Sequence, residues 1–137
     1  MKLSVVTTLF SSANYINEFH ERVSKAVMDL IGDDFEIIFV NDGSEDKSLE
    51  IVMGLMEQDK KIKILDLSRN FGHHKAMMTG LEYAKGEKVF LIDVDLEEQP
   101  EWLRSFDEQL EREGLDVVYG VQANRKGNFF EKISGYL

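Results

Sequence analysis

The chain has 137 residues, and its 26 acidic and 16 basic side chains give a formal net charge of −10. This length is typical of one domain, so we expect a single domain over residues 1–137. The acidic balance argues against nucleic acid as a partner, because binding to phosphates requires a basic surface. The absence of cysteine excludes a disulfide scaffold, a zinc ribbon and thiol catalysis. No apolar run approaches the roughly 18 residues of a membrane span, and no signal peptide is recognisable, so a soluble intracellular domain is expected.

Apolar stretches and segments with helical spacing alternate along the chain. The apolar stretches begin near Leu3, Phe35, Ile62, Lys88 and Asp116, at intervals of 32, 27, 26 and 28 residues. Such short runs of β-branched and aromatic residues are typical of strands that are covered on both faces. The helical stripes run from Ile16 to Leu30, Leu49 to Met56, Ala76 to Ala84 and Leu103 to Leu110. This alternation predicts an α/β fold with a mainly parallel sheet and helices on both faces.

Glycine and proline mark the expected ends of these helices. Gly32, Gly86 and Gly114 each follow a helical stripe, where a left-handed residue without Cβ often ends a helix. Pro100 is the only proline, and it stands where the fourth helix is expected to begin. A proline is well tolerated there because the first turn of a helix does not use its N–H groups.

The segment from Val121 to Leu137 does not complete another strand–helix unit. Phe129, Phe130, Ile133 and Tyr136 have helical spacing, and the chain ends one residue later. We therefore expect a C-terminal helix. Either the chain is cut from a longer one within or after this helix, or the helix is an ordinary C-terminal one that folds back on the sheet.

Polar segments follow each of the first four expected strands. They are Phe10 to Asn14, Asn41 to Asp46, Ser68 to Lys75 and Asp93 to Glu98. In open parallel sheets, ligands bind beyond the carboxyl ends of the strands. Acidic and amide side chains are therefore expected to converge at one edge of the sheet.

Two aspartates leave the apolar fourth strand with one residue between them. While the chain stays extended, Asp93 and Asp95 point the same way, with Cα atoms about 6–7 Å apart. Carboxylates that close repel unless a cation or a proton lies between them, and hard oxygen ligands select Mg²⁺ or Mn²⁺. Glu97 is a candidate for a further ligand. The alternative is a solvated acidic turn that caps the helix beginning at Pro100.

The segment Asp42-Gly43-Ser44 directly follows the second strand. In one interpretation, Gly43 allows a sharp turn while Asp42 accepts a hydrogen bond from the base or ribose of a nucleotide. In the other, Ser44 or Asp46 caps the next helix. Both interpretations can hold together, since one residue can cap while another binds.

A concentrated cationic patch, made by Arg69, His73, His74 and Lys75, lies at the start of the third expected helix. Backbone N–H groups at a helix start add a positive end. Arg69 either approaches a diphosphate or pairs with nearby carboxylates. Adjacent histidines cannot easily both face one metal ion on a helix, so we expect solvated or helix-start roles for His73 and His74.

Four ordered motifs resemble those of family 2 glycosyltransferases of the GT-A fold. The motifs are Thr7 to Ile16, Phe39 to Asp46, Leu67 to Gly72 and Leu91 to Leu96. Together with Val117 to Gly120 and Arg125-Lys126, they look most like the branch that glycosylates polyprenyl phosphates. The resemblance runs from about Leu3 to Leu137 and implies the Rossmann-like, nucleotide-binding half of a GT-A fold, with acceptor-side elements missing.

The sequence departs from this family in two places. Thr7-Thr8 stands where a proline is usual, and Phe10-Ser11-Ser12 replaces Tyr-Asn-Glu. Gln122 stands where an arginine is common, which weakens the acceptor assignment.

The motifs and the resemblance together imply a set of site residues. The nucleotide-binding residues are Phe10, Asp42, Ser44, Arg69 and Asp93; the metal ligands are Asp95 and Glu97; the catalytic pair is Asp93 and Asp95; and Arg125 contacts the acceptor phosphate.

The implied activity is that of an inverting glycosyltransferase, which uses a UDP- or GDP-linked sugar and Mg²⁺ or Mn²⁺ to transfer a hexose to a polyprenyl phosphate. The metal would neutralise the departing nucleoside diphosphate. A lipid phosphate is already anionic and needs a cationic clamp in place of a general base. A cytoplasmic location is implied, at the membrane only through further C-terminal segments.

Three alternatives remain open. A transferase acting on a sugar hydroxyl in surface polysaccharide synthesis would need a general base, which would lie beyond this chain. A fragment with only the nucleotide-binding half would bind its donor without turnover. From another class, a Mg²⁺-binding receiver domain would have its acidic pair after the first strand, where this chain has Leu9 to Ser12, and a lysine ending the fifth, where it has Val118-Tyr119-Gly120.

Overall fold

The computed structural model describes residues 1–122 and 130–135, and side chains up to residue 120. It divides into two compact units, residues 1–100 and residues 101–137. The expected single domain over the whole chain therefore stays a prediction. None of the helices in the described ranges is both long enough and apolar enough to cross a lipid bilayer.

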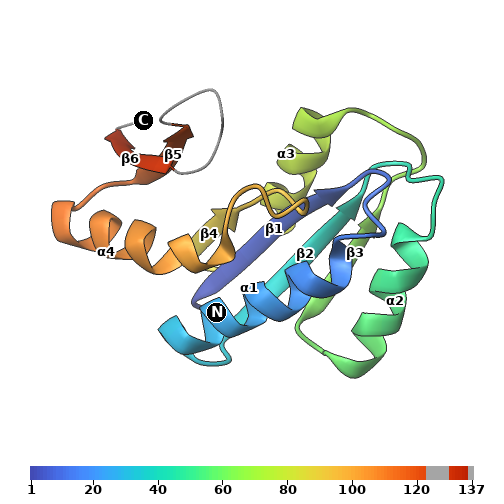
Figure 1. Cartoon of the computed structure of the whole chain (residues 1–137), viewed down its shortest axis with the longest axis horizontal. Coiled ribbons are helices and arrows are strands. Elements are labelled where there is room, and N and C mark those ends of the chain that lie inside the picture. Colours follow the sequence, from blue (N-terminus) through green and yellow to red (C-terminus); the bar gives the residue numbers. More distant parts are fainter. Residues whose placement is uncertain (123–129, 136–137) are drawn as a thin grey trace. The chain divides into compact units, whose positions relative to one another are not determined.

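Strands and helices alternate through the first unit (Figure 1). They are β1 (Leu3–Leu9), α1 (Ile16–Ile31), β2 (Phe35–Asn41), α2 (Ser48–Gln58), β3 (Ile62–Asp66), α3 (His73–Tyr83) and β4 (Lys88–Leu91). The four strands form one parallel sheet in the order β3-β2-β1-β4. In this register Leu3 of β1 lies opposite both Phe35 and Lys88. The predicted α/β fold with a parallel sheet is confirmed.

The sheet is covered on both faces because its strands are apolar on both. Helices α1 and α2 lie on one face and α3 on the other (Figure 1). On the first face, the ring of Phe19 in α1 meets Phe39 of β2 edge to face, with centroids 5.9 Å apart. On the second, Ala76 of α3 packs against Val6 and Ile38. Burial of all seven residues of β2 follows from this two-sided covering.

The glycines after the helical stripes have different roles. Gly114 ends its helix in the left-handed conformation (φ 62°, ψ 39°), as predicted, and Gly32 also has a positive φ of 83°. The prediction for Gly86 is wrong, because α3 ends at Tyr83 and Gly86 is not among the glycines with positive φ. A Cβ at Gly86 would lie 2.4 Å from the backbone nitrogen of Ser4. Gly86 is therefore required by the close approach of the α3–β4 connection to β1.

A buried carboxylate ties this connection to the amino ends of the strands. Glu36 is 1% exposed and accepts hydrogen bonds from Ser4 Oγ (2.8 Å), Lys63 Nζ (2.5 Å) and the Lys85 N–H (2.9 Å). The Gly86 N–H donates in turn to Ser4 Oγ at 2.8 Å. Burial raises the pKa of Glu36, but the bonds from Lys63, Lys85 and Ser4 outweigh burial and hold this pKa below its usual value. Glu36 is thus ionised, and both of its carboxylate oxygens accept hydrogen bonds.

In its described residues, the second unit contains an α-helix and a pair of antiparallel strands. A 3₁₀ turn over Pro100–Trp102 spans the boundary and leads into α4 (Leu103–Glu113), which is followed by β5 (Val117–Gln122) and β6 (Phe130–Gly135). The predicted helix start at Pro100 is confirmed. Strands β5 and β6 pair antiparallel, with Val117 opposite Gly135.

One expectation for this unit is wrong. The residues expected to form a C-terminal helix include Phe130 and Ile133, which lie in β6 instead. A six-residue run with only two apolar positions is too short for its spacing to distinguish a helix from a strand, and pairing with β5 supplies the hydrogen bonds that make it a strand. Phe129 and Tyr136 lie outside the described residues.

We predict that Glu36→Gln lowers the free energy of unfolding by about 1–3 kcal/mol at neutral pH, because it removes a buried charge-assisted bond to Lys63. The folded pKa of Glu36 is lowered, so its contribution is complete above the ordinary value of 4.5 and is lost as the pH falls through the folded value. Urea unfolding at several pH values should show the difference from wild type narrowing in acid. Glu50→Gln, at an exposed position of α2, is the control. If the difference in the free energy of unfolding between Glu36→Gln and wild type did not change with pH, it would contradict an ionised Glu36 in the folded protein.

We also predict that Gly86→Ala destabilises the protein by about 1–3 kcal/mol, because the new methyl group would collide with the backbone of β1. The matched control is Gly54→Ala in α2, where a Cβ meets nothing within 4 Å, and this change should stabilise the helix by up to about 1 kcal/mol. Thermal unfolding of the two variants would measure the contrast, and equal effects would refute the close approach.

Candidate functional site

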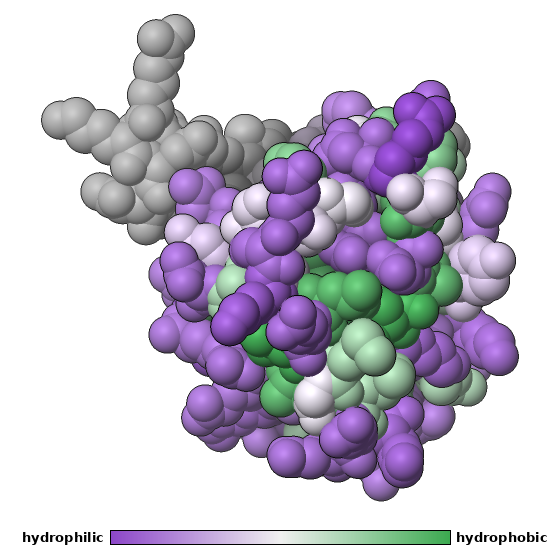
Figure 2. Space-filling view, turned by 90° about the vertical axis from the view of Figure 1, so that its right-hand side faces the viewer, coloured by the Kyte–Doolittle hydropathy of each residue, from purple (hydrophilic) through white to green (hydrophobic). Residues whose placement is uncertain are grey.

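The carboxyl ends of the four parallel strands bring the polar loops to one edge of the first unit. Strand β1 is followed in sequence by its neighbour β2, whereas β4 lies on the other side of β1. Strand order therefore reverses between β1 and β4, and in such sheets this is where a ligand crevice forms. Figure 2 faces this end of the strands and shows an apolar area bordered by hydrophilic side chains.

Hydrogen bonds join the loop after β1 to the loop after β2. Three N–H groups of the first loop donate to side chains of the second: Ser11 to Ser44 Oγ (3.2 Å), Ser12 to Ser48 Oγ (2.8 Å) and Ala13 to Asp46 Oδ2 (3.2 Å). Ser11 has a positive φ of 54°, which is uncommon for a residue with a side chain. Directly before it, Phe10 is 56% exposed. The two loops thus form one unit with an aromatic ring at its surface.

Asp46 supports the start of α2. Its Oδ1 accepts hydrogen bonds from the N–H (3.0 Å) and the hydroxyl (2.6 Å) of Ser48. The bond from the Ser48 hydroxyl is the main cause of the lowered pKa of Asp46. The N-cap position of α2 is taken by Lys47 and by neither predicted candidate; Asp46 accepts the Ser48 N–H from one position earlier, while Ser44 bonds to the loop after β1.

Asp42 is buried and connects the loop after β2 to the loop after β3. It is 3% exposed, and its Oδ1 accepts the Phe71 N–H at 2.7 Å. The Asn70 side-chain amide donates to the Asp42 carbonyl oxygen (3.0 Å) and to Oδ2 (3.4 Å). Gly43 has a φ of 74°, and a Cβ there would lie 2.5 Å from the Asn70 nitrogen. The sequence suggested the sharp turn at Gly43 but gave no signal for the contribution of Asn70.

The loop after β3 presents a guanidinium group to solvent. The Arg69 guanidinium lies over the ring of Phe71, 4.4 Å from its centroid. Arg69 is exposed, while Phe71 is half-buried and tied to Asp42 through its N–H. This stacking holds the Arg69 charge near the carboxyl end of the sheet, where it is accessible to an anion.

The two aspartates after β4 flank a buried residue. Strand β4 ends at Leu91, so Asp93 and Asp95 lie in the turn that follows and not in an extended strand. Both are partly exposed, while Val94 between them is buried. The Glu97 N–H donates to Asp95 Oδ1 at 3.1 Å, and the Glu97 side chain is exposed.

Glu98 is a fourth carboxylate at this turn, with a role that the sequence did not indicate. Its Oε1 accepts the Asp93 N–H at 2.9 Å. Burial is the main cause of the raised pKa of Glu98, and repulsion from Asp93 and Asp95 adds to it. No local pattern distinguishes Glu98 from Glu97, because the direction of each side chain depends on how the turn folds.

His73 lies between β1 and the turn after β4. Its Nδ1 is 3.2 Å from Thr8 Oγ1, and its Nε2 is 3.6 Å from Asp93 Oδ1. As the first residue of α3, His73 occupies the helix start that was predicted. The contact with Asp93 was not predicted, since it depends on the order of the strands.

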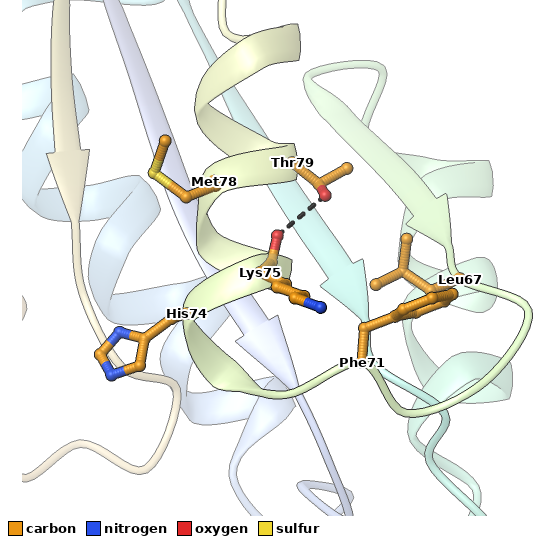
Figure 3. Close-up of a pocket in the computed structure, with 6 residues that line it drawn as sticks. All are labelled: Leu67, Phe71, His74, Lys75, Met78 and Thr79. Atoms are coloured by element: carbon orange, nitrogen blue, oxygen red, sulfur yellow. Dashed lines mark hydrogen bonds between the residues drawn. The ribbon is translucent and has the colours of Figure 1, made fainter.

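A shallow pocket of about 450 Å³ lies beside α3 (Figure 3). It is lined by Leu67, Phe71, His74, Lys75, Met78 and Thr79. Leu67 and Phe71 come from the loop after β3, and the other four from α3. None of the predicted site residues lines this pocket, so it is separate from the acidic turn.

The donor set of the acidic turn fits a divalent metal that is bound together with a phosphate ligand. Among residues 1–122 and 130–135, no group of three or more His, Cys, Asp or Glu side chains is arranged to hold a metal ion. Asp93 and Asp95 nevertheless supply two accessible carboxylates. Mg²⁺ is commonly held by one or two carboxylates, with phosphate oxygens and water completing its shell.

The structure brings most of the predicted site residues to the same edge. Phe10, Ser44, Asp42, Arg69, Asp93, Asp95 and Glu97 all follow carboxyl ends of the parallel strands in the first unit. Arg125, the predicted contact for the acceptor phosphate, lies outside the described residues.

Comparison with solved structures finds related folds. A structure of S. aureus TarS (residues 1–349) in complex with UDP-GlcNAc has a TM-score of 0.68 and 28% identity, covering 90% of this chain and 36% of that one. The mannosyltransferase PcManGT from Pyrobaculum calidifontis, in complex with GDP-Man and Mn²⁺, has a TM-score of 0.60 and covers 69% of this chain and 27% of its own. At 20% identity, the second likeness shows the fold alone. The predicted GT-A fold is confirmed.

Sequence comparison finds relatives over almost the whole chain. A Mycobacterium tuberculosis protein named "Putative glycosyltransferases" is 51% identical over 97% of this chain. An Enterobacter protein named undecaprenyl-phosphate 4-deoxy-4-formamido-L-arabinose transferase is 33% identical over 96% of it. The chain spans about 40% of the length of each of these two relatives. Residues 4–137 match the model of the family described as Glycosyl transferase family 2, so the chain belongs to that family.

Proposed function

We propose that this chain binds the nucleoside-diphosphate sugar of an inverting glycosyltransferase that transfers a hexose to a polyprenyl phosphate. The observation that carries the proposal is the crevice position between β1 and β4, where Asp93 and Asp95 follow one strand and Phe10 follows the other. Such a position combines an acidic pair for a metal with an exposed ring for a nucleotide.

The nucleotide would be held by the joined loops after β1, β2 and β3. The exposed ring of Phe10 offers a stacking surface for a base. Asp42 already accepts protein hydrogen bonds, but a carboxylate has further lone pairs with which to accept one from a base. Ser44 and the stacked Arg69 guanidinium would complete the binding of the ribose and diphosphate.

Asp93 and Asp95, with Glu97 as a further ligand, would hold Mg²⁺ or Mn²⁺ beside the diphosphate. When bound, such a metal neutralises negative charge that develops on the leaving nucleoside diphosphate. The Glu97 N–H fixes Asp95 Oδ1, and Glu98 fixes the backbone at Asp93. The turn thus holds the Asp95 carboxylate and the backbone of Asp93 before a ligand arrives, which lowers the cost of ordering them on binding.

The acceptor is proposed from the chemistry of a phosphate group together with the names of relatives. A lipid phosphate is an anionic nucleophile and requires no general base, only cationic groups that position it. The Enterobacter relative is named as a transferase to undecaprenyl phosphate. Arg125 remains the predicted contact for the acceptor phosphate. We place the site on the cytoplasmic side of the membrane.

We predict that Asp95→Asn weakens the Mn²⁺-dependent binding of UDP or GDP by about tenfold or more, because a neutral amide is a poor ligand for a hard dication. Isothermal titration of wild type and variant, with Mn²⁺ and with a chelator, would measure this. Asp33→Asn, at an exposed aspartate preceding β2, is the matched control and should bind like wild type. Metal-independent binding by the wild type would remove the metal assignment.

For the acceptor, we expect the protein at its natural length to transfer hexose to a polyprenyl phosphate with inversion at the anomeric carbon. Arg125→Ala should raise the KM for the lipid phosphate about tenfold and leave the affinity for the donor nucleotide unchanged. Product analysis and steady-state kinetics would measure these effects. Transfer to saccharide hydroxyls alone would refute the lipid-phosphate acceptor without affecting the donor site.

A further inference from the structure

We propose that His73 is a positioning residue that holds the Asp93 carboxylate in place for the nucleotide-sugar donor. Thr8 sets the tautomer of the His73 ring. This inference rests on the proposed function, because it assigns to Asp93 a contact with the donor. It adds a residue of α3 to a site otherwise formed by the loops after the strands.

The position of the His73 ring is the first argument. Three elements meet at this ring: α3 carries it, Thr8 belongs to β1, and Asp93 follows β4. Nδ1 lies 3.2 Å from Thr8 Oγ1, and Nε2 lies 3.6 Å from Asp93 Oδ1. One ring nitrogen therefore faces β1 and the other faces the turn after β4, the two elements between which the strand order reverses.

The chemistry of the two neighbours determines which nitrogen carries the proton. A carboxylate is negative and only accepts hydrogen bonds, so a proton on the ring nitrogen that faces Asp93 is favoured over a lone pair there. A threonine hydroxyl can donate a hydrogen bond, which Nδ1 of that tautomer accepts. Thr8 thus favours the Nε2–H form, since the hydrogen bond made by one ring nitrogen sets the protonation of the other.

The charges around Asp93 explain why such a contact matters. The Asp93 and Asp95 carboxylates both repel the Glu98 carboxylate, which accepts the Asp93 N–H. His73 Nε2 lies 3.6 Å from Asp93 Oδ1, a polar contact that is longer than a hydrogen bond. With Oδ1 in contact with His73, Oδ2 remains for the ribose or for a water molecule on the metal.

His74 offers a natural control. It is the next residue, its ring lies 5.8 Å from that of His73, and it is exposed beside the pocket of Figure 3. It has the same chemistry and almost the same place on the helix. Changes at His74 therefore test for general effects of removing an imidazole at the start of α3.

The first test needs neither nucleotide nor metal. In ¹⁵N NMR spectra recorded at a pH where the ring is neutral, His73 should be predominantly the Nε2–H tautomer. Thr8→Val and Asp93→Asn should each shift the balance toward Nδ1–H, while the spectrum of His74 stays unchanged. A mixed tautomer of His73 that neither substitution alters would overturn the proposal.

The second test measures the affinity for UDP or GDP with Mn²⁺ by titration calorimetry. His73→Ala and His73→Asn should weaken binding about threefold to fivefold, the size expected for a polar contact between partly exposed side chains. His73→Gln, which carries an N–H group near the position of Nε2, should restore most of the affinity. His74→Ala should bind like wild type.

A double-mutant comparison separates positioning from a general effect on the fold. In the Asp93→Asn background, His73→Ala should cause no further loss of affinity, because the partner is already gone. A further loss of the same size in this background would overturn the proposal, as would wild-type affinity in His73→Ala. If the wild-type chain binds no nucleoside diphosphate, the proposed function fails, and the tautomer measurement still decides the role of His73.

Discussion

The pairing of β1 with a parallel strand on each side is the constraint on which the rest of the structure depends. β1 shares hydrogen bonds with β2 along its whole length and with β4 from Leu3 to Val6. This central position brings the loop after β1 between Asp42 on one side and Asp93 on the other. If β1 were an edge strand, these two carboxylates would not flank the same loop. The crevice position is therefore a property of strand order, and no single residue creates it.

The carboxylates at this edge are organised by donors that the chain supplies itself. Asp42 accepts the N–H of Phe71, Asp95 that of Glu97, and Glu98 that of Asp93. Backbone donors hold each of these carboxyl groups in one orientation. A protein with a net charge of −10 thus keeps an acidic edge that is ordered and still attractive to a cation. At the opposite ends of the strands, Glu36 is instead paired with Lys63 and has a structural role.

Much of the first unit was predictable because its signals are local. The apolar runs and helical stripes gave the type and order of the elements in residues 1–100, and Gly43 indicated a sharp turn that the structure contains. Predictions that relied on spacing alone were less secure. Gly86 follows a helix as a C-terminal glycine would, yet close approach to Ser4 is what excludes a side chain there. Phe130 and Ile133 fit a helical period, yet pairing with Gln122 and Tyr119 of β5 makes them part of a strand.

The sequence by itself determined which polar residues follow each strand, and hence that Asp42, Arg69, Asp93 and Asp95 belong to one edge of a parallel sheet. This was possible because hydrophobic period and turn chemistry act over a few residues. Only the tertiary structure decided which of these groups touch: Asn70 with Asp42, Glu98 with Asp93, and His73 with both Thr8 and Asp93. Those contacts join residues as far as 65 positions apart, because strand order and the path of each turn bring them together. Local patterns carry no information about either.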